Sequence, residues 1–390
     1  MVMQTAERLS RIPAYPFADL DRRVQRLRQA GIDVINLGIG DPDLPTPAPV
    51  VDRLSEAARR REFQQYPDYA GSLRFRSAVA RYYARRYGVR LDPEREVLGL
   101  IGSKEGIAHL SWALAGPGDV VLVPDPGYPV YRTQALLAGA EPVSIPLRRE
   151  RGFQPDFGAV SSEVARRATL LWLNYPHNPT GAVAGPCLFA EAVSFCRTYD
   201  VVLAHDLAYG EIGFDGYRAP SALAGRRSDD LRVEFFSLSK PYAMTGFRLA
   251  AAVGSADVLE ALGTLKANTD SGPFGAVQEA GVRALEQDLD AMVEGAARVY
   301  RRRRDLVLDA LRTAGLCAEP PRATFYLWVP LPDGVSDGAA VDRLVADAAV
   351  AVTPGTAYGA FGAGCIRVSL TAPDTRIEEA CRRIATRVRF

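Results

Sequence analysis

The sequence predicts an α/β fold built around a mostly parallel β-sheet, together with a smaller α+β domain. Short β-rich runs alternate with helical patterns through the middle of the chain, which is typical of helices that cover both faces of a parallel sheet. After about residue 275 this alternation gives way to a long helical stretch and two further strand-like runs.

The strands expected in the large sheet are five short apolar runs. They are "EVLGLIG" (96–102), "DVVLVP" (119–124), "ATLLWLNYP" (168–176), "VVLAHD" (201–206) and "RVEFFSLS" (232–239). The runs "ATFYLWVPL" and "CIRVSL" are expected in the second domain. We therefore divide the chain into an N-terminal arm with part of the small domain (1–45), a large domain (46–275) and a small C-terminal domain (276–390).

The composition of the 390 residues, 48% hydrophobic and 24% charged, is that of a globular protein. The net charge of +1 gives no reason to expect a nucleic acid or an anionic membrane as partner. The arginine runs "ARRRE" (58–62) and "RRRR" (301–304) are interpreted as solvated helix faces.

Five scattered cysteines and three histidines argue against a disulfide framework and against a metal site. The N-terminus has no signal-peptide core, and no apolar run approaches the roughly 20 residues of a membrane span. A cytoplasmic protein is expected.

Polar, turn-forming clusters follow the central strands. They are "GSKEG" (102–106), "DPGYP" (125–129), "NYPHNPTG" (174–181), "HDLAYGE" (205–211) and "SLSKP" (237–241). Open α/β sheets bind ligands at the carboxyl ends of their strands. These five clusters are therefore expected to line one crevice.

Lys240 in the last cluster is unusual because only three of the 47 basic residues are lysines: Lys104, Lys240 and Lys266. Arginine stays protonated in proteins, whereas a desolvated lysine amine can become neutral and attack a carbonyl to form a Schiff base. Chance survival of a lysine is the alternative interpretation.

The other clusters contain what pyridoxal phosphate would need. Gly102, Ser103 and Lys104 begin a helix, where an anion is favoured, and Ser237 and Arg248 can add donors. Further candidates are Asp206 for the pyridine nitrogen, Asn178 and Tyr209 for the ring oxygen, and Tyr128 for stacking on the ring. Each of these residues alone is more often a turn, cap or packing residue than part of a cofactor site.

In combination, "NPTG", the Asp-x-x-Tyr of "HDLAY" and "SLSK" followed by Arg248 resemble the class I/II aminotransferases of fold type I, from residue 35 to 370. The resemblance implies an aspartate-aminotransferase-like fold, pyridoxal phosphate and a homodimer with shared active sites. It implies catalytic roles for Lys240, Asp206 and Tyr209. The implied cofactor residues are Ser103, Lys104, Tyr128, Asn178, Asp206, Tyr209, Ser237, Ser239, Lys240 and Arg248, with Tyr66 from the partner subunit.

The implied substrate residues include Arg367, for the α-carboxylate, Gly40 and Asn178. Within the family, "RIPAYPFADLDRR" and "KANTDSGPFGAVQEA" look like the LL-diaminopimelate aminotransferase group, which adds Tyr15, Lys104 and, across the dimer, Asn268. The chain departs from that group's pattern at Ala70, Leu207, Gly210, Ala243 and Phe247. An altered distal substrate pocket with weak activity on LL-diaminopimelate is therefore expected.

Three functions are compared. The first is transamination of an α-amino acid. The second is elimination or replacement of a β- or γ-substituent, as on an S-adenosylmethionine-type substrate in a specialised biosynthetic pathway. The third is a non-enzymatic effector domain of a regulator, which is disfavoured because the motifs already begin by about residue 35.

Overall fold

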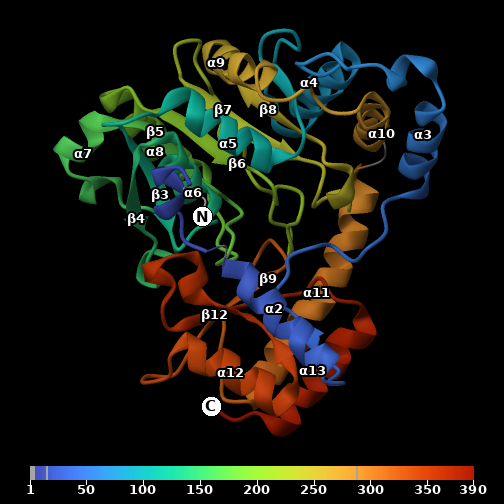
Figure 1. The fold of residues 1–390 in the computed structure, drawn as a ribbon, viewed down its shortest axis with the longest axis vertical. Coiled ribbons are helices and arrows are strands. Elements are labelled where there is room, and N and C mark those ends of the chain that lie inside the picture. The colour runs from blue at the N-terminus through green and yellow to red at the C-terminus, as the bar shows by residue number, and fades with distance from the viewer. Residues whose placement is uncertain (1–4, 15, 287–288) are drawn as a thin grey trace.

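The structure, a computed structural model, describes residues 5–14, 16–286 and 289–390. Figure 1 shows two regions stacked along the long axis of the molecule. The upper region is built around a sheet covered by helices, and the lower region combines the helix α2 (Pro16–Gln29) with the C-terminal part of the chain. Tyr15 lies outside the described residues.

A seven-stranded mixed sheet of order β2-β8-β7-β6-β5-β3-β4 forms the centre of the upper region. Only β8 runs antiparallel to its neighbours. The strands are β2 (Val97–Leu100), β3 (Val120–Asp125), β4 (Glu141–Pro146), β5 (Ala168–Leu173), β6 (Val202–Asp206), β7 (Arg232–Ser237) and β8 (Ala250–Gly254). All five strands expected here from the sequence are confirmed.

The strands β4 and β8 were not expected, and their sequences explain why. Proline removes a ladder donor and is depleted in strands, which weakens the strand signal of β4, an edge strand that contains both Pro142 and Pro146. The strand β8 has the sequence "AAAVG", and alanine and glycine are both depleted in strands. Its burial between β2 and β7 outweighs that weak local preference.

Helices cover both faces of this sheet because successive strand residues point to opposite sides. In β7, Phe235 packs in the cluster that holds α5, α6 and α9, and Phe236 packs in the cluster that holds α3, α4 and α10. The helices are α3 (Ala48–Ala58), α4 (Leu73–Tyr87), α5 (Ser103–Leu114), α6 (Val130–Ala138), α7 (Ser162–Arg167), α8 (Pro186–Tyr199), α9 (Ala256–Ala267) and α10 (Gly275–Glu286).

The lower region is a smaller α+β unit with its own apolar core. Its strands β9 (Tyr326–Pro330), β12 (Cys365–Ser369) and β11 (Thr353–Pro354) form an antiparallel sheet, and β1 (Ile35–Asn36) pairs in parallel with β10 (Val350–Ala351). Its helices are α2, α11 (Leu289–Thr313), α12 (Asp337–Ala348) and α13 (Asp374–Arg387). The domain boundaries at residues 45 and 275 stay a prediction.

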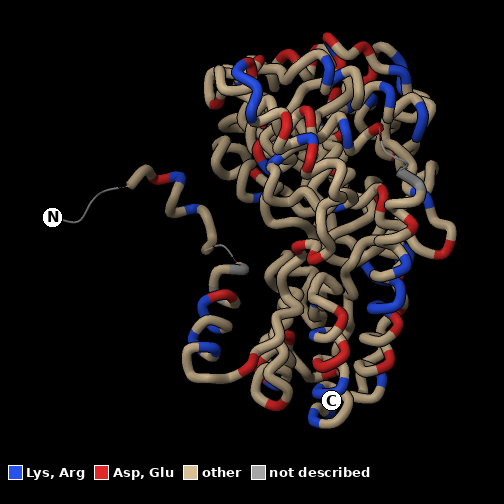
Figure 2. The backbone as a smooth tube through the Cα atoms, turned by 90° about the vertical axis from the view of Figure 1, so that its right-hand side faces the viewer, with Lys and Arg blue, Asp and Glu red and all other residues tan. Residues whose placement is uncertain are grey.

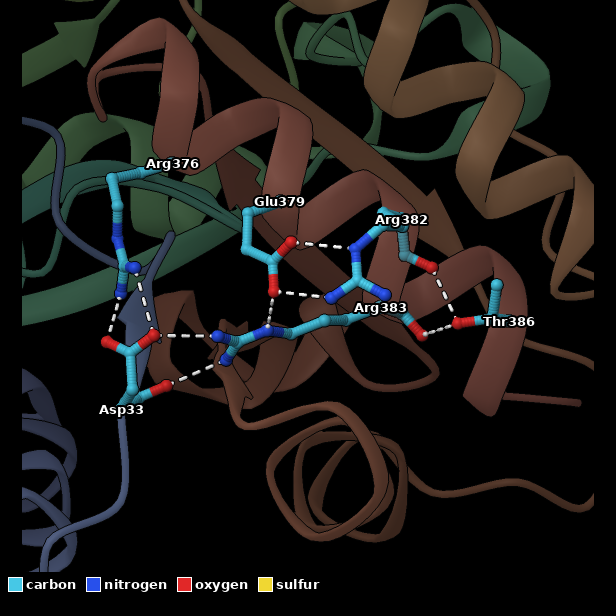
Figure 3. A network of polar contacts seen from close by, with 6 residues as sticks. All are labelled: Asp33, Arg376, Glu379, Arg382, Arg383 and Thr386. Atoms are coloured by element: carbon cyan, nitrogen blue, oxygen red, sulfur yellow. Dashed lines mark hydrogen bonds and ion pairs between the residues drawn. The ribbon is translucent and has the colours of Figure 1, made fainter.

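An ionic network joins the N-terminal segment to the last helix (Figure 3). The Asp33 carboxylate accepts hydrogen bonds from Arg376 and Arg383 at 2.6 Å, and Arg383 also donates to Glu379 in α13. The two guanidinium groups lower the pKa of Asp33 to about 2. The segment before β1 is thereby held against the small domain.

Two of the four arginines in the run "RRRR" (301–304) are not solvated, so the interpretation of this run as a solvated helix face is wrong for those two. Arg303 and Arg304 are buried, and Arg303 donates both terminal nitrogens to the Asp43 carboxylate at 2.6 and 2.9 Å. Arg303 thus anchors the chain segment that follows β1. Figure 2 shows basic and acidic residues interspersed over both regions, with residues 5–14, including α1 (Glu7–Ser10), projecting from the body.

Candidate active site

A cavity of about 480 Å³ lies where the strands β3, β5, β6 and β7 end, between the large sheet and the small domain. Its wall contains twelve of the residues predicted from the sequence. They are Gly40, Ser103, Lys104, Tyr128, Asn178, Asp206, Tyr209, Ser237, Ser239, Lys240, Arg248 and Arg367. The expected convergence of strand ends on one crevice is confirmed.

Lys240 follows β7 by three residues and points across the cavity toward the segment after β1. Its Nζ donates a hydrogen bond to the backbone carbonyl of Gly40 at 2.6 Å. Burial lowers the pKa of Lys240 to about 8, with Arg367 and Arg248 adding to the effect and Asp41 and Asp206 opposing it. A substantial fraction of this amine is therefore neutral near pH 8, as a nucleophile requires.

Asp206 ends β6 and is buried, and one of its two carboxylate oxygens accepts a side-chain hydrogen bond. The hydroxyl of Tyr131 donates to Oδ2 at 2.8 Å, whereas the buried Oδ1 has no hydrogen-bond partner among the described residues. Burial raises the pKa of Asp206 to about 6, and the Tyr131 bond opposes this shift. A buried acceptor without a partner is costly, so Oδ1 is suited to a cationic N–H donor of a ligand.

The N-terminus of α5 and Arg248 form an anion-binding corner. Gly102, the N-cap, has φ of +84°, and a Cβ there would lie 2.2 Å from Arg248 Nη2, so only glycine lets the guanidinium approach. The helix has no side-chain cap, and the buried Ser103 Oγ has no partner in the described structure. Free helix N–H groups beside an arginine suit a phosphate.

Lys104 stands at the same corner. Burial, and then the nearby Arg248, lower the pKa of Lys104. On the facing strand end, Ser239 N donates to Ser237 Oγ at 3.2 Å, which turns the chain after β7 toward the cavity. The two cations Lys104 and Arg248 and the three serines Ser103, Ser237 and Ser239 thus all line the cavity.

Arg367, in β12, reaches from the small domain into the site and is 3% exposed. It donates to Asn178 Oδ1 at 2.8 Å and to the carbonyl of Gly38 at 2.6 Å. Its guanidinium carbon lies 4.0 Å from the ring centre of Tyr326, whose hydroxyl is 3.1 Å from that of Tyr209. A permanent, buried guanidinium so held is suited to a carboxylate.

Two predicted residues do not line the cavity of their own chain. Tyr66 is 88% exposed and follows a short 3₁₀ turn, Arg61–Gln64. Asn268 is exposed at the end of α9, where its side-chain amide donates to the Thr264 carbonyl at 2.9 Å. The resemblance places both in the site of a partner subunit, and that placement stays a prediction.

Five residues differ from the pattern of the LL-diaminopimelate aminotransferase group, and they lie outside the cavity wall. They are Ala70, Leu207, Gly210, Ala243 and Phe247. Leu207 and Gly210 fit each other, since a Cβ on Gly210 would lie 2.9 Å from the Leu207 side chain. Phe247 packs against the core beside α4, and the Ala243 carbonyl accepts a hydrogen bond from Thr46. Ala70 lies in the segment that carries Tyr66. These five residues could therefore alter the distal substrate pocket only by shifting the residues of the wall, or by lining the site of a partner subunit.

Several residues of the wall were missed by sequence reasoning. Tyr131 and Asn174 lie within or beside quoted clusters, and an amphipathic reading of α6 could have found Tyr131. Asp21 in α2, Asp41 and Tyr326 carry no local signal, because the packing of the small domain brings them to the cavity. Asp21 and Asp41 thus add two carboxylates to the cavity wall that the sequence did not predict there.

Lys266, the third lysine, lies behind the anion-binding corner. It is fully buried, and its Nζ lies 2.6 Å from Asp270 Oδ1 and 3.5 Å from Glu105 Oε2. His109 Nδ1 lies 2.6 Å from Glu105 Oε1. Glu105, His109 and Asp270 are near enough to hold a metal ion, but the Lys266 ammonium already supplies a cation to both carboxylates.

These features define the class of protein. A partly buried lysine with a lowered pKa, an unpaired carboxylate oxygen and an anion-binding helix end lie around one cavity. They fit pyridoxal 5′-phosphate, which needs an amine for its aldehyde, a partner for its pyridinium and donors for its phosphate. The chain belongs to the class I and II aminotransferases, whose family model matches residues 32–384. It is a pyridoxal-phosphate-dependent transaminase.

Curated relatives extend over the whole chain. It is 50% identical over 382 residues to the LL-diaminopimelate aminotransferase of Moorella thermoacetica, which covers 98% of each chain. It is 48% identical to the enzyme of the same name from Desulforudis audaxviator, covering 97% of this chain and 96% of that one. Relatives of these names favour transamination over elimination or replacement.

Solved structures show the same fold. Substrate-bound BacF from Bacillus subtilis superposes with a TM-score of 0.94 at 34% identity, covering 98% of each chain. A probable N-succinyldiaminopimelate aminotransferase from Thermus thermophilus gives 0.89 at 41% identity, covering 95% of this chain and 99% of that one. Among the described residues, none of the helices is both long and apolar enough to cross a membrane.

Proposed function

We propose that this transaminase takes the amino group of an α-amino acid whose carboxylate is held by Arg367, with Lys240 as the catalytic base. The observation that supports this proposal most strongly is that Lys240, Asp206 and Arg367 line one cavity. When bound, pyridoxal phosphate supplies the electron sink that acidifies the Cα proton of the substrate.

The proposed roles divide the cavity into two ends. Ser103, Lys104, Ser237, Ser239 and Arg248 hold the phosphate, and Tyr128 packs on the ring. Asp206, whose Oδ1 has no partner among the described residues, would pair with the pyridinium, and Asn178 and Tyr209 would hold the ring oxygen. Tyr326, stacked on Arg367 at 4.0 Å, keeps the guanidinium in place for the substrate carboxylate. Gly40 contributes its backbone at the substrate end.

Lys240 performs the proton transfer in this proposal. Its Nζ would take the Cα proton of the substrate and hold it for return during the transfer of the amino group. An amine with a pKa of about 8 can both accept and release a proton near neutral pH.

The lysine assignment is tested by borohydride reduction of the holoenzyme and peptide mapping. The reduced pyridoxyl group is expected on Lys240, and its recovery on Lys104 or Lys266 would overturn the assignment. Lys240→Arg should lose covalent attachment and about 10²–10⁴-fold in rate, because arginine cannot act as a base. Lys266→Arg, at a buried ion pair, is the matched control for attachment.

We also propose a homodimer in which Tyr66 and Asn268 complete the partner's site. The support is their exposure outside the cavity of their own chain, together with the projecting residues 5–14 (Figure 2). Mixing Tyr66→Phe and Lys240→Ala homodimers places both lesions in one site of the mixed dimer and leaves the other intact. Activity should rise on mixing; no rise despite proven subunit exchange would refute shared sites.

A cytoplasmic location remains part of the proposal. Its support is that the five cysteines are all unpaired, which suits a reducing compartment. Detection of the protein in the periplasmic or extracellular fraction of its native cells would contradict this.

A further inference from the structure

Lys266 is the lysine that the proposed function leaves without a role, and it lies in the interior of the protein. It belongs to α9 and is 0% exposed. Its Nζ lies 2.6 Å from Asp270 Oδ1 and 3.5 Å from Glu105 Oε2. A buried ammonium is costly unless it is paired, so the two carboxylates are what allow a lysine at this position.

Both carboxylates are also needed by the backbone around them. Glu105 Oε2 accepts a hydrogen bond from Ile101 N at 2.9 Å, and Asp270 Oδ1 accepts one from Gly272 N at 2.7 Å. The second oxygen of Glu105 lies 2.6 Å from His109 Nδ1. Loss of either carboxylate would leave a backbone donor without its partner, so the fold keeps two negative charges in this place.

The Glu105 carboxylate lies at the same helix end as the anion-binding corner. Glu105 is in the first turn of α5, next to Lys104 in the chain, and it accepts from Ile101, the residue before the N-cap. Anions are favoured at a helix N-terminus, so this carboxylate and a bound phosphate draw on the same helix end and repel each other. A phosphate monoester with about 1.5–2 negative charges meets the cations Lys104 and Arg248 here. An uncompensated carboxylate behind these cations would weaken its binding.

We propose that Lys266 is a positioning residue for the cofactor phosphate, because it offsets the charge of Glu105 behind the anion-binding corner. This inference rests on the proposed function, which places the phosphate at the N-terminus of α5. Lys266 is not among the described residues of the cavity wall, so it acts through Glu105 and not by contact. Removing one member of a buried ion pair leaves an unpaired charge, whereas removing both members does not. Lys266 and Glu105 are therefore coupled in their effect on the phosphate.

Calorimetric binding of pyridoxamine 5′-phosphate and of pyridoxamine to the cofactor-free protein tests this. Neither compound forms a covalent bond to Lys240 and only the first carries the phosphate, so the ratio of the two affinities is the phosphate preference. Lys266→Met keeps a similar side-chain length without the charge and should lower this preference about tenfold. Glu105→Gln keeps an acceptor for Ile101 N and should not lower it. The double variant Lys266→Met, Glu105→Gln should return to within about threefold of the unmodified protein.

Arg304→Met is the matched control, because it removes another buried cation at an ion pair outside the cavity. Arg304 Nη1 lies 2.9 Å from Asp215 Oδ2, and this change should leave the phosphate preference unaltered. Equal weakening of both ligands by Lys266→Met, or a double variant as impaired as Lys266→Met alone, would overturn the inference. If Lys266→Met does not fold, Glu105→Gln and the double variant decide: loss of the phosphate preference in either refutes the inference, and retention in both supports it.

Arg248→Met, at a residue assigned to the phosphate itself, separates the two proposals. It should lower the phosphate preference by at least about tenfold, because it removes a direct charge-assisted contact. An unchanged preference in Arg248→Met would refute the proposed phosphate site, and the inference with it. A loss in Arg248→Met that Lys266→Met does not share would refute the inference alone and leave the proposed function intact.

Discussion

Removing the hydroxyl of Tyr131 should raise the pKa of Asp206 and make the stability of the cofactor-free protein more dependent on pH. The Tyr131 ring lies 5.0 Å from that of Trp172 at an interplanar angle of 14°, so phenylalanine conserves the stacking. Burial raises the pKa of Tyr131 itself, which keeps its hydroxyl protonated as a donor. Tyr131→Phe therefore deletes one hydrogen bond and little packing.

The magnitude follows from the charge of the acceptor. A hydrogen bond to an ionised group contributes about 1.5–3 kcal/mol and one to a neutral group about 1 kcal/mol. At about 1.4 kcal/mol per pKa unit, the net change of roughly 0.5–2 kcal/mol shifts the equilibrium by about 0.4–1.5 units. Starting from about 6, the pKa of Asp206 in the variant should lie between about 6.4 and 7.5.

The sign of the pH dependence is unusual for an aspartate. The folded pKa of about 6 is above the ordinary value of 3.8, so the folded state binds more protons between these pH values. The free energy of unfolding therefore falls as pH rises from about 4 to 6, and in the variant this fall continues to about 6.4–7.5. The destabilisation by Tyr131→Phe should thus be larger at pH 8 than at pH 5.

Urea unfolding of the cofactor-free protein at pH 5 and pH 8 measures this difference. The infrared band of the protonated Asp206 carboxyl, identified by its loss in Asp206→Asn, gives the pKa directly. Tyr217→Phe is the control, since the Tyr217 hydroxyl donates to the neutral Ala184 carbonyl at 3.0 Å and its loss should cost the same at both pH values. An unchanged Asp206 pKa in Tyr131→Phe would refute the reasoning.

Three further predictions concern the same cavity. Asp206→Asn should still bind the cofactor but lose about 1.5–3 kcal/mol or more of transition-state stabilisation, because an amide cannot pair with the pyridinium charge; near-native kcat would remove Asp206 from this role. Arg367→Lys should raise KM for the amino donor about 10–100-fold while leaving cofactor affinity unchanged, since lysine cannot form the forked contact; an unchanged KM would contradict carboxylate binding there. Covalent capture of pyridoxal phosphate by the cofactor-free protein should accelerate as pH rises through about 8, where Lys240 loses its proton, and a stopped-flow profile that keeps rising to the ordinary lysine value of 10.5 would contradict a lowered pKa.

The residues that sequence reasoning found are those whose roles depend on local chain geometry. Asp206 and Ser237 end strands, and Ser103 begins a helix directly after one. Once a parallel sheet is expected, the positions of these residues at one edge follow from topology. The scarcity of lysine then singled out Lys240.

The residues that it missed depend on how the small domain packs on the large one. Asp21 and Asp41 come from segments that β1, β10 and the Arg303–Asp43 pair hold in place. Arg303 itself looked solvated because its acidic partners, Asp43 and Asp374, are distant in the sequence. Such contacts leave no periodic signal, and neither does β8, whose alanines are buried only because two strands flank it.

The most direct test of the transaminase assignment is a single-turnover experiment on the holoenzyme without an acceptor keto acid. The protein is mixed with a panel of amino acids that includes L-ornithine, L-lysine and LL-diaminopimelate, and the released cofactor and product are identified by mass spectrometry. We expect one equivalent of pyridoxamine 5′-phosphate and one of the corresponding keto acid per active site. Recovery of unchanged pyridoxal 5′-phosphate together with free ammonia or another leaving group would contradict transamination.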